Sequence, residues 1–202
     1  MKGKKMWEIS KDFACCYGHR VHNQKLDKEY SLDTACVCRH LHGHQMSVRV
    51  HLCGDKLKDG MVTDFKHLNW FKKFIDDVID HKFLIDKDDP LFSTLLPDIN
   101  CKPDQGEDQK FVKRVGTDNF EGDNVFMYRD EGYWILNPMV YKDYPIEKQE
   151  LYEGYVVVPF VPTSENISAW FYEIIREKMK KLCKVSRVEF WETPKSRSQY
   201  AD

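Results

Sequence analysis

The stretch that most constrains this chain runs from Cys38 to His44 and carries three histidines and a cysteine. A strand-like run, Gln45 to Leu52, follows it directly. Alternate side chains of an extended chain point to the same face, so His42 and His44 project together. Gly43 between them lets the backbone approach a ligand closely. The segment can therefore supply two ligands of a zinc site, although a histidine-rich strand end with satisfied hydrogen bonds remains the plainer alternative.

A third ligand is needed, because catalytic zinc is held by three protein groups and keeps a fourth position open. The segment Trp7–His19 alternates apolar and polar residues, which predicts a strand with His19 on its apolar face. A histidine on such a face is more often a core residue with satisfied hydrogen bonds. His19 becomes the candidate third ligand because the pair downstream lacks one.

The composition is that of an ordinary globular protein, with 202 residues, 42% of them hydrophobic, and a formal net charge of -2. No basic excess predicts a nucleic acid or an anionic membrane as partner. No apolar run approaches the length of about 18 residues that a membrane span requires, and no signal-peptide pattern follows the basic N-terminus. The seven cysteines therefore predict reduced thiols in a cytoplasmic protein.

The middle of the chain predicts one helix between two loops. Asn23–Thr34 is polar and charged, as is typical of a loop. Asp64 is a good N-cap for a helix that ends near Asp80 and His81. Lys82–Leu96 is interpreted as a transition segment with a turn at Asp88–Pro90.

The C-terminal part predicts a second helix and a last strand. The helix starts at Pro162–Glu165, where a hydroxyl residue caps it and an acid follows. The strand Val185–Thr193 places Glu192 on its apolar face, and burial of an acid is costly unless the acid is paired. Glu192 is therefore expected to be partnered or functional. Pro194–Asp202 is interpreted as a polar tail.

Residues 97–155 are the least regular part. A structureless loop of that length is uncommon in a compact domain, and strand-like patches occur at Val125–Tyr128 and Tyr133–Leu136. We expect a β-rich insertion or subdomain within a single domain over residues 1–202, followed by a strand or extended lead-in at Tyr155–Val161. The order strand, strand, helix, insertion, helix, strand predicts an α+β fold with helices on one face of an antiparallel sheet.

Short motifs over Trp7–Leu84 and Pro162–Glu192, about half of the chain, together resemble a known family. It is the 6-pyruvoyltetrahydropterin synthase superfamily, and within it the 6-carboxytetrahydropterin synthase branch of the queuosine pathway. The motifs are Phe13 with His19-Arg20-Val21, Cys38 ahead of Leu41-His42-Gly43-His44, Gly60 to Phe65, Asp80-His81, Pro162 to Glu165, and Glu192-Thr193.

The resemblance implies the tunnelling fold. In that fold, four-stranded antiparallel sheets with two helices on one face join between subunits into a barrel. It also implies a homo-oligomer with active sites between neighbouring subunits. The implied zinc ligands are His19, His42 and His44. The implied catalytic residues are Cys38, Asp80 and His81. The implied substrate-binding residues are Glu192, Thr163 and Ser164.

The implied reaction converts 7,8-dihydroneopterin triphosphate to 6-carboxy-5,6,7,8-tetrahydropterin, acetaldehyde and triphosphate. The residue chemistry agrees with these roles. Three neutral imidazoles leave the charge of Zn²⁺ available to polarise substrate oxygens, and a thiolate can take a proton. An Asp beside a His orients the imidazole, and a carboxylate suits the N–H groups of a pterin edge.

Three alternatives remain at this point. Cys36 has the spacing of the pyruvoyl branch, whose reaction is triphosphate elimination to 6-pyruvoyltetrahydropterin, whereas Cys38 has that of the carboxy branch and is favoured. A branch with a glutamate in place of the thiol works as an aldolase, and Cys38 argues against it. From another class, the domain could be a zinc-stabilised, non-catalytic binding module. Arg20, Lys195 and Arg197 are candidates for holding the triphosphate, with ordinary solvated charge as the plainer alternative.

Overall fold

A computed structural model of the chain describes residues 6–33, 35–99, 111–112 and 132–202. The chain divides into two compact units. The first comprises Met1–Cys15, Gln45–Asp77 and Ser164–Asp202, and the second comprises Cys16–His44 and Val78–Thr163.

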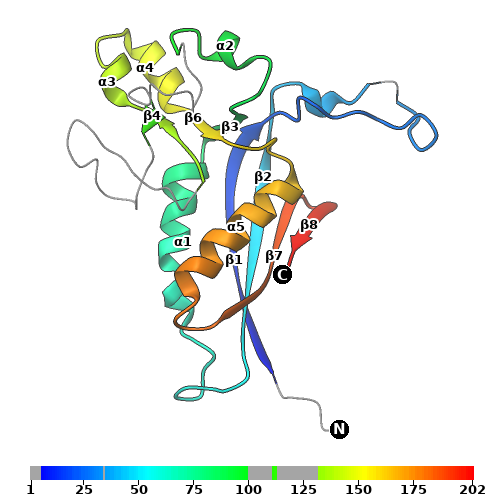
Figure 1. The fold of residues 1–202 in the computed structure, drawn as a ribbon, viewed down its shortest axis with the longest axis vertical. Helices are drawn as coiled ribbons and strands as arrows, with labels where there is room; N and C mark the ends of the chain where they lie inside the picture. Colours follow the sequence, from blue (N-terminus) through cyan, green and yellow to red (C-terminus); the bar gives the residue numbers. More distant parts are fainter. Residues whose placement is uncertain (1–5, 34, 100–110, 113–131) are drawn as a thin grey trace. The chain divides into compact units, whose positions relative to one another are not determined.

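The first unit contains strands in the order β1-β2-β7-β8 (Figure 1). Their bounds are β1 Trp7–His19, β2 His42–Gly54, β7 Lys184–Thr193 and β8 Ser196–Tyr200. β7 pairs antiparallel with both β2 and β8. The bounds predicted for the first strand are confirmed, and the second and last strands are slightly longer than predicted. The last residues of β1 and the first of β2 belong to the second unit.

The predicted first helix is present as three consecutive segments, the 3₁₀ turn η2 Phe65–Leu68, α1 Asn69–Phe74 and the π-helical η3 Ile75–Ile79. Asp64 caps it as predicted, since its carboxylate accepts a hydrogen bond of 2.7 Å from the backbone N–H of Lys66.

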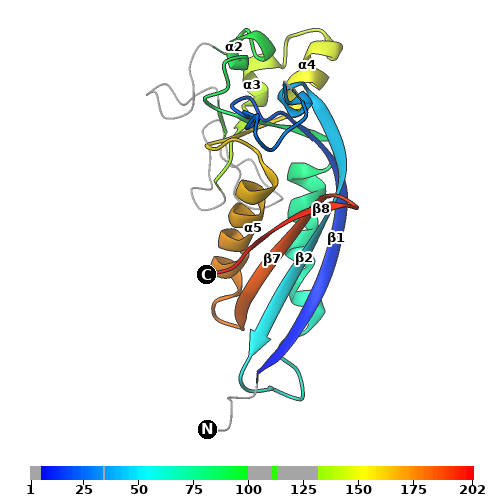
Figure 2. The ribbon, with the colours of Figure 1, turned by 90° about the vertical axis from the view of Figure 1, so that its right-hand side faces the viewer.

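The second predicted helix is α5 Ser164–Met179, which packs along β7 and β8 (Figures 1 and 2). Aromatic rings join both helices to the sheet. Phe71 of α1 lies 5.1 Å from Phe13 of β1 and 5.5 Å from Phe171 of α5, and Phe171 lies 6.2 Å from Phe190 of β7 (centroid distances). The core of this unit is therefore apolar and lies between the helices and the strands.

The polar tail expected at Pro194–Asp202 is wrong, because residues 196–200 form the edge strand β8. Its sequence, Ser-Arg-Ser-Gln-Tyr, has few apolar side chains because an edge strand of this kind is mostly solvated. Tyr200 is the exception, and its ring lies 5.2 Å from that of Tyr172 in α5.

The second unit adds two parallel strands beside the end of β1. β3 Lys82–Asp86 pairs with β1 through Tyr17↔Lys82 and Gly18↔Phe83, and β6 Tyr155–Val158 pairs with β3. The transition expected at Lys82–Leu96 therefore contains a strand, followed by α2 Phe92–Leu95. The four-stranded antiparallel sheet expected from the resemblance is corrected to a six-stranded mixed sheet, although the α+β class stands.

The described part of residues 97–155 is less strand-rich than expected. It holds the two-residue strands β4 Phe111–Val112 and β5 Ile135–Leu136, and also the helices α3 Pro138–Tyr141 and α4 Ile146–Glu153 (Figure 1). The patch predicted at Val125–Tyr128 lies outside the described residues. A buried cluster within this unit consists of Ile85, Phe92, Leu96, Ile99, Leu136, Tyr141, Tyr152, Tyr155 and Val157.

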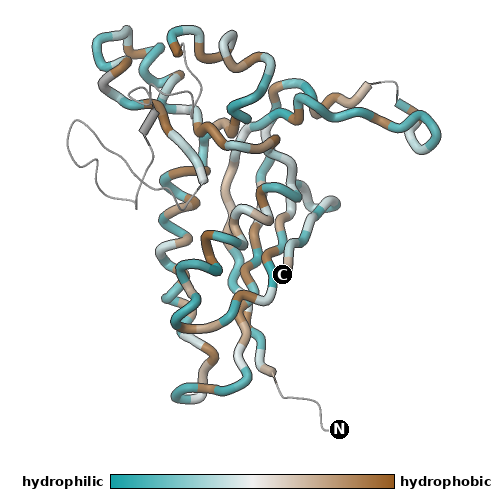
Figure 3. Tube along the Cα trace, in the orientation of Figure 1, coloured by the Kyte–Doolittle hydropathy of each residue, from teal (hydrophilic) through white to brown (hydrophobic). Residues whose placement is uncertain are grey.

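The loop that leads from β1 to β2 is mainly hydrophilic in Figure 3, as predicted for Asn23–Thr34, of which Thr34 lies outside the described residues. The short 3₁₀ turn η1 Val37–Arg39 follows it. Among the described residues, no helix has the length and apolar character that crossing a membrane requires.

Candidate metal centre and acid–base pair

Three histidines of the second unit come together where β1 ends and β2 begins. The ring centroids of His19 and His42 are 4.5 Å apart, those of His19 and His44 5.2 Å, and those of His42 and His44 4.9 Å. One potential ligand atom of each lies within 4.8 Å of the other two. The alternation and spacing of the sequence had suggested this grouping, and the structure brings the three rings together.

Carbonyl oxygens orient two of these rings. His19 Nδ1 lies 2.6 Å from the carbonyl oxygen of Pro162, and His42 Nδ1 lies 2.8 Å from that of His40. A carbonyl can only accept, so we assign the proton to Nδ1, which leaves the Nε2 lone pair of each neutral ring to bind a metal. Metal-binding histidines in proteins are commonly oriented in this way. Three neutral nitrogen donors suit Zn²⁺ and the neighbouring divalent transition metals.

Gly43 is required by the strand next to it. A Cβ on Gly43 would lie 2.9 Å from the carbonyl oxygen of Tyr17, and one on Gly18 would lie 2.6 Å from the ring of Phe83. Because real Cβ atoms do not approach a backbone oxygen so closely, Gly43 lets β1 and β2 meet beside the histidines. The sequence analysis expected Gly43 to let the backbone approach a ligand closely, and the structure shows Gly43 in close approach to the backbone of Tyr17.

Asp80 and His81 form a fixed carboxylate–imidazole pair after the first helix. Asp80 Oδ2 lies 3.0 Å from His81 Nδ1, and Asp80 Oδ1 accepts a 2.9 Å hydrogen bond from the backbone N–H of Cys16. The backbone N–H of His81 donates to the carbonyl of Cys16 at 2.7 Å. His81 has a left-handed backbone with φ 58°, and its side chain is 82% exposed. The pair thus presents the imidazole outward.

A pocket of about 620 Å³ in the second unit contains residues of both groups. Its lining consists of Cys16, Tyr17, Gly18, His42, Gly43, His44, His81, Lys82, Phe83 and Gly154. Two histidines of the cluster therefore share a pocket with the imidazole of the carboxylate–imidazole pair. Sequence reasoning did not predict that the backbone of Cys16 holds Asp80 and His81, because a backbone contact between distant residues leaves no mark on the local pattern.

The two competing cysteines have different surroundings. The Cys36 thiol donates to Gln24 Oε1 at 3.0 Å, whereas the backbone carbonyl of Cys38 accepts from Val21 N–H at 2.9 Å. Within the part of the chain that the structure describes, the lining of the pocket does not include Cys38. The structure thus gives Cys36 a bonding role of its own and places Cys38 in η1 beside the strand that ends in His19.

The predicted substrate-binding residues are divided between the units. The backbone N–H of Thr163, in the second unit, donates to Val161 O at 2.7 Å. In the first unit, Ser164 begins α5 and its carbonyl accepts from Ser198 Oγ at 2.7 Å. Glu192 of β7 is half-buried. The buried acid of β7 is instead Glu189, which lies 3.3 Å from His51 and 3.2 Å from Arg187.

The three basic residues considered as triphosphate ligands, Arg20, Lys195 and Arg197, differ in burial and in their partners. Arg20 is buried and lies 3.3 Å from Asp89, so the expectation of a solvated charge is wrong for it. Arg197 lies 3.4 Å from Glu189 and its guanidinium lies 5.5 Å from the ring of Trp191. Lys195 is exposed in the turn between β7 and β8.

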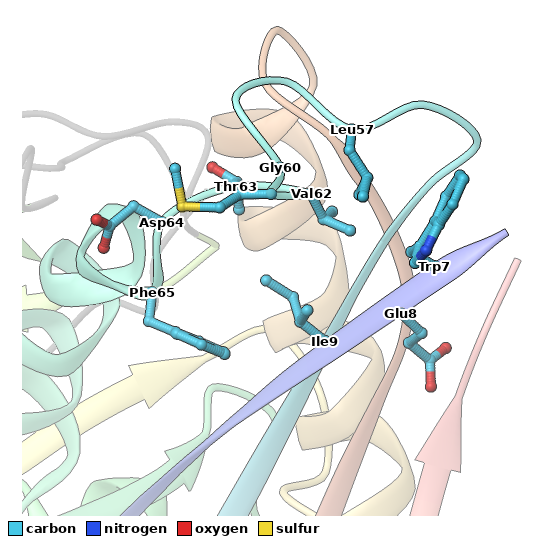
Figure 4. Close-up of a pocket in the computed structure, with 10 residues that line it drawn as sticks. Trp7, Glu8, Ile9, Leu57, Gly60, Val62, Thr63, Asp64 and Phe65 are labelled. Atoms are coloured by element: carbon cyan, nitrogen blue, oxygen red, sulfur yellow. The ribbon is translucent and has the colours of Figure 1, made fainter.

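A second pocket, of about 280 Å³, lies in the first unit beside the start of β1 (Figure 4). The motif Gly60 to Phe65 supplies six of its lining residues, and Trp7, Glu8, Ile9 and Leu57 supply the others. The motif also holds itself in place, because Thr63 Oγ1 lies 2.7 Å from His67 Nδ1. No metal-type histidine cluster is found there among the described residues.

The model of one protein family, described as 6-pyruvoyl tetrahydropterin synthase, matches residues 8–202. The chain is 28% identical to the 6-carboxy-5,6,7,8-tetrahydropterin synthase of Aquifex aeolicus, over 97% of this chain and 98% of that protein. It is 37% identical to the enzyme of the same name from Haemophilus influenzae, over 39% of this chain and 66% of that protein.

Solved structures agree on the fold. An uncharacterized protein of Wolinella succinogenes superposes with a TM-score of 0.85 at 46% identity, with 98% of this chain and 99% of that chain covered. A variant of Plasmodium vivax 6-pyruvoyltetrahydropterin synthase superposes with a TM-score of 0.50 at 16% identity, over 97% of each chain. The Aquifex and Wolinella matches extend over nearly the whole chain, so the segment 97–155 is not peculiar to it.

Proposed function

The chain belongs to the 6-pyruvoyl tetrahydropterin synthase family, and on that premise we propose that it is a zinc-dependent 6-carboxy-5,6,7,8-tetrahydropterin synthase. The substrate would be 7,8-dihydroneopterin triphosphate, and the products 6-carboxytetrahydropterin, acetaldehyde and triphosphate. The observation that carries the proposal is the pocket in which His42 and His44 lie with the Asp80-held imidazole of His81. The names of the Aquifex and Haemophilus relatives support the choice of branch.

His19, His42 and His44 would hold the Zn²⁺, and the donor set fits it, since all three are imidazoles and two are oriented through Nδ1. Bound there, Zn²⁺ would supply Lewis acidity toward the side-chain oxygens of the substrate. Pro162 and His40 would keep the rings of His19 and His42 in place through their carbonyls.

The proton-transfer residues would be Cys38 and His81. Asp80 Oδ2 lies 3.0 Å from His81 Nδ1, so we assign a proton to Nδ1 and the proton exchange with the substrate to Nε2. Cys38 would take the proton from the substrate carbon as a thiolate. Glu192 would accept hydrogen bonds from the pterin's amino-pyrimidine edge, with Thr163 and Ser164 beside it.

We further propose that the active protein is a cytoplasmic homo-oligomer. The exposed imidazole of His81 and a pocket whose described lining lacks Cys38 both favour a site that a second copy completes. A general acid or base must come within hydrogen-bond reach of the group that it serves. A neighbouring copy could supply the thiol to this imidazole.

The test is a product assay of zinc-loaded protein with 7,8-dihydroneopterin triphosphate, using mass spectrometry and acetaldehyde detection. Wild type should release acetaldehyde, Cys38→Ala should not, and Cys36→Ala should retain activity, because the Cys36 thiol is bonded to Gln24. A 6-pyruvoyl product without acetaldehyde would assign the other branch. Zinc bound stoichiometrically without turnover would refute the enzyme and leave a zinc-stabilised binding module.

A further inference from the structure

Three consecutive residues after His19 make contacts within the second unit. Arg20 and His22 contact the turn between β3 and α2, and Val21 contacts the turn that bears Cys38. We call Arg20–His22 the ligand-adjacent segment and Asp86–Leu91, between β3 and α2, the anchor turn. We propose that Asp86 and Asp89 of the anchor turn are positioning residues that hold this segment and thereby fix both His19 and the turn bearing Cys38. The inference rests on the proposed function, because it concerns the same metal and thiol groups.

Arg20 and Asp89 make the first contact. Arg20 Nε lies 3.3 Å from Asp89 Oδ2, and both side chains are buried, with 8% and 1% of their surface exposed. The other oxygen of Asp89 accepts a hydrogen bond of 2.7 Å from the backbone N–H of Leu91. Asp89 is therefore fixed by its own turn, and its second oxygen faces the residue that directly follows a metal ligand.

His22 and Asp86 repeat this arrangement. His22 Nε2 lies 2.9 Å from Asp86 Oδ2, and both side chains are again largely buried. Asp86 Oδ1 accepts a hydrogen bond of 3.0 Å from the backbone N–H of Asp88. Each carboxylate thus uses one oxygen within the anchor turn and the other on the ligand-adjacent segment. Two such contacts from one turn constrain a short segment far more than either contact alone.

Val21, between the two clamped residues, reaches the thiol-bearing turn. Its backbone N–H donates to the carbonyl oxygen of Cys38 at 2.9 Å. Its own carbonyl accepts from the N–H of Gln24, whose side chain accepts from the Cys36 thiol. The position of the ligand-adjacent segment therefore sets that of η1 as well as that of His19.

The anchor turn is held by α2, by the buried cluster around α2 and by β6. It leads into α2, whose Phe92 is buried together with Leu96, Leu136 and Tyr152. The backbone N–H of Lys87 also donates to Val158 of β6 at 2.9 Å. The described part of residues 97–155, for which the sequence predicted only a β-rich insertion, thereby acquires a role as a brace for the metal and thiol groups.

The central variant is Asp89→Asn, which leaves the charge of Arg20 buried without its counter-ion. The matched control is Tyr152→Phe, which removes the 2.5 Å hydrogen bond that Tyr152, a member of the same buried cluster, donates to Asp98, and which leaves Arg20 and His22 unchanged. A third variant, Arg20→Met with Asp89→Asn, removes both charges and keeps an oxygen that accepts from the backbone N–H of Leu91, so it should restore stability without restoring the tether.

Three quantities are measured on the full-length protein. They are the dissociation constant for Zn²⁺, the absorption spectrum of the Co²⁺-substituted site, and the iodoacetamide alkylation rate of Cys38 in the metal-free protein, by peptide mapping. Cys183 is the internal reference for alkylation, because burial, together with Cys53, raises the pKa of its thiol to about 11.

For Asp89→Asn we expect Zn²⁺ binding to weaken about tenfold, as for loss of outer-shell support, with a changed Co²⁺ spectrum and severalfold faster alkylation of Cys38. Asp86→Asn should change the same three quantities in the same direction. The double variant at Arg20 and Asp89 should keep the weaker zinc binding and the faster alkylation of Cys38 while recovering thermal stability. Tyr152→Phe should lower thermal stability but leave zinc binding, the Co²⁺ spectrum and Cys38 alkylation unchanged.

The inference would be overturned if Asp89→Asn and Tyr152→Phe, at an equal loss of stability, changed zinc binding and Cys38 alkylation equally. It would also be overturned if the double variant at Arg20 and Asp89 recovered wild-type zinc binding and alkylation. If wild type bound no zinc and made no product, the proposed function would fail, and the alkylation rates of Cys38 would still decide the positioning role.

Discussion

Gly43 and Tyr17 are in such close contact that a Cβ on Gly43 would be 2.9 Å from the carbonyl oxygen of Tyr17. The contact joins β1 and β2 between the histidines that each strand contributes. A methyl group at this position must push the strands apart, since backbone cannot swing away as a side chain does.

Gly43→Ala is therefore expected to destabilise the protein by about 1–3 kcal/mol, in the range of overpacked sites, and to weaken zinc binding. Urea unfolding and zinc titration would measure both. Gln45→Ala, at an exposed position on the same face of β2, is the control and should leave both unchanged. Unaltered zinc binding in Gly43→Ala would mean that the strand contact does not align the ligands.

Asp80→Asn tests the carboxylate–imidazole pair. An amide can still accept from the backbone of Cys16, but it cannot orient the His81 imidazole as a carboxylate does, so under the proposed function kcat should fall by at least about 10²-fold. Zinc binding should not change. Asp76→Asn, which removes an exposed pair with Lys72 on the preceding helix, is the control for loss of a carboxylate. A KM change with unaltered kcat would place Asp80 in substrate binding only.

Metal dependence is tested with His44→Ala. Wild type should bind one Zn²⁺ per chain and gain about 2.7 kcal/mol of stability at a free zinc concentration one hundred times the Kd. His44→Ala should lose tight binding, and a chelator should remove the gain in wild type. His40→Ala keeps the carbonyl that holds His42 and should behave as wild type, since the side chain of His40 is exposed.

Acid stability depends partly on Asp12 in the first unit. Hydrogen bonds from the Arg49 guanidinium lower the pKa of the Asp12 carboxyl in the folded protein. A lowered folded-state pKa contributes stability above the unfolded-state value, which is about 3.9, and this contribution is lost as the pH falls through the folded-state value. The effect is small, because both side chains are about half exposed.

Asp12→Asn should therefore lower the thermal midpoint slightly at pH 7 and by less near pH 2. Asp33→Asn, an exposed loop residue, is the control. An equal difference between wild type and Asp12→Asn at both pH values would show that the carboxylate charge contributes nothing.

Local sequence signals predicted the first strand and the Asp64 cap, because alternation and capping depend on residues within a few positions of one another. They also brought His19 to the histidine pair, since the strand that ends in His19 fixes which way its side chain points. The carboxylate beside His81 is likewise a neighbour in sequence.

Long-range relationships were not predictable in this way. β3 is a five-residue strand with charged ends whose parallel partners are distant in sequence, and β8 is too polar to show alternation. The burial of Arg20 depends on Asp89, and the carbonyl that orients His19 belongs to Pro162. Such pairings follow from topology, which a single sequence does not display.

The left-handed backbone at His81 narrows the choice of residue there. Among residues with a Cβ, asparagine, aspartate and histidine tolerate this conformation best, whereas β-branched residues are effectively barred. Of these three, only the imidazole ordinarily gains and loses a proton near neutral pH. The proposed function gives His81 a proton-transfer role, so natural variation at this position should be nearly absent in active relatives. Under the proposed function, a relative carrying asparagine or glycine there would accommodate the left-handed backbone but lack the proposed proton transfer, so this residue would be a marker for separating enzymes from inactive members of the family.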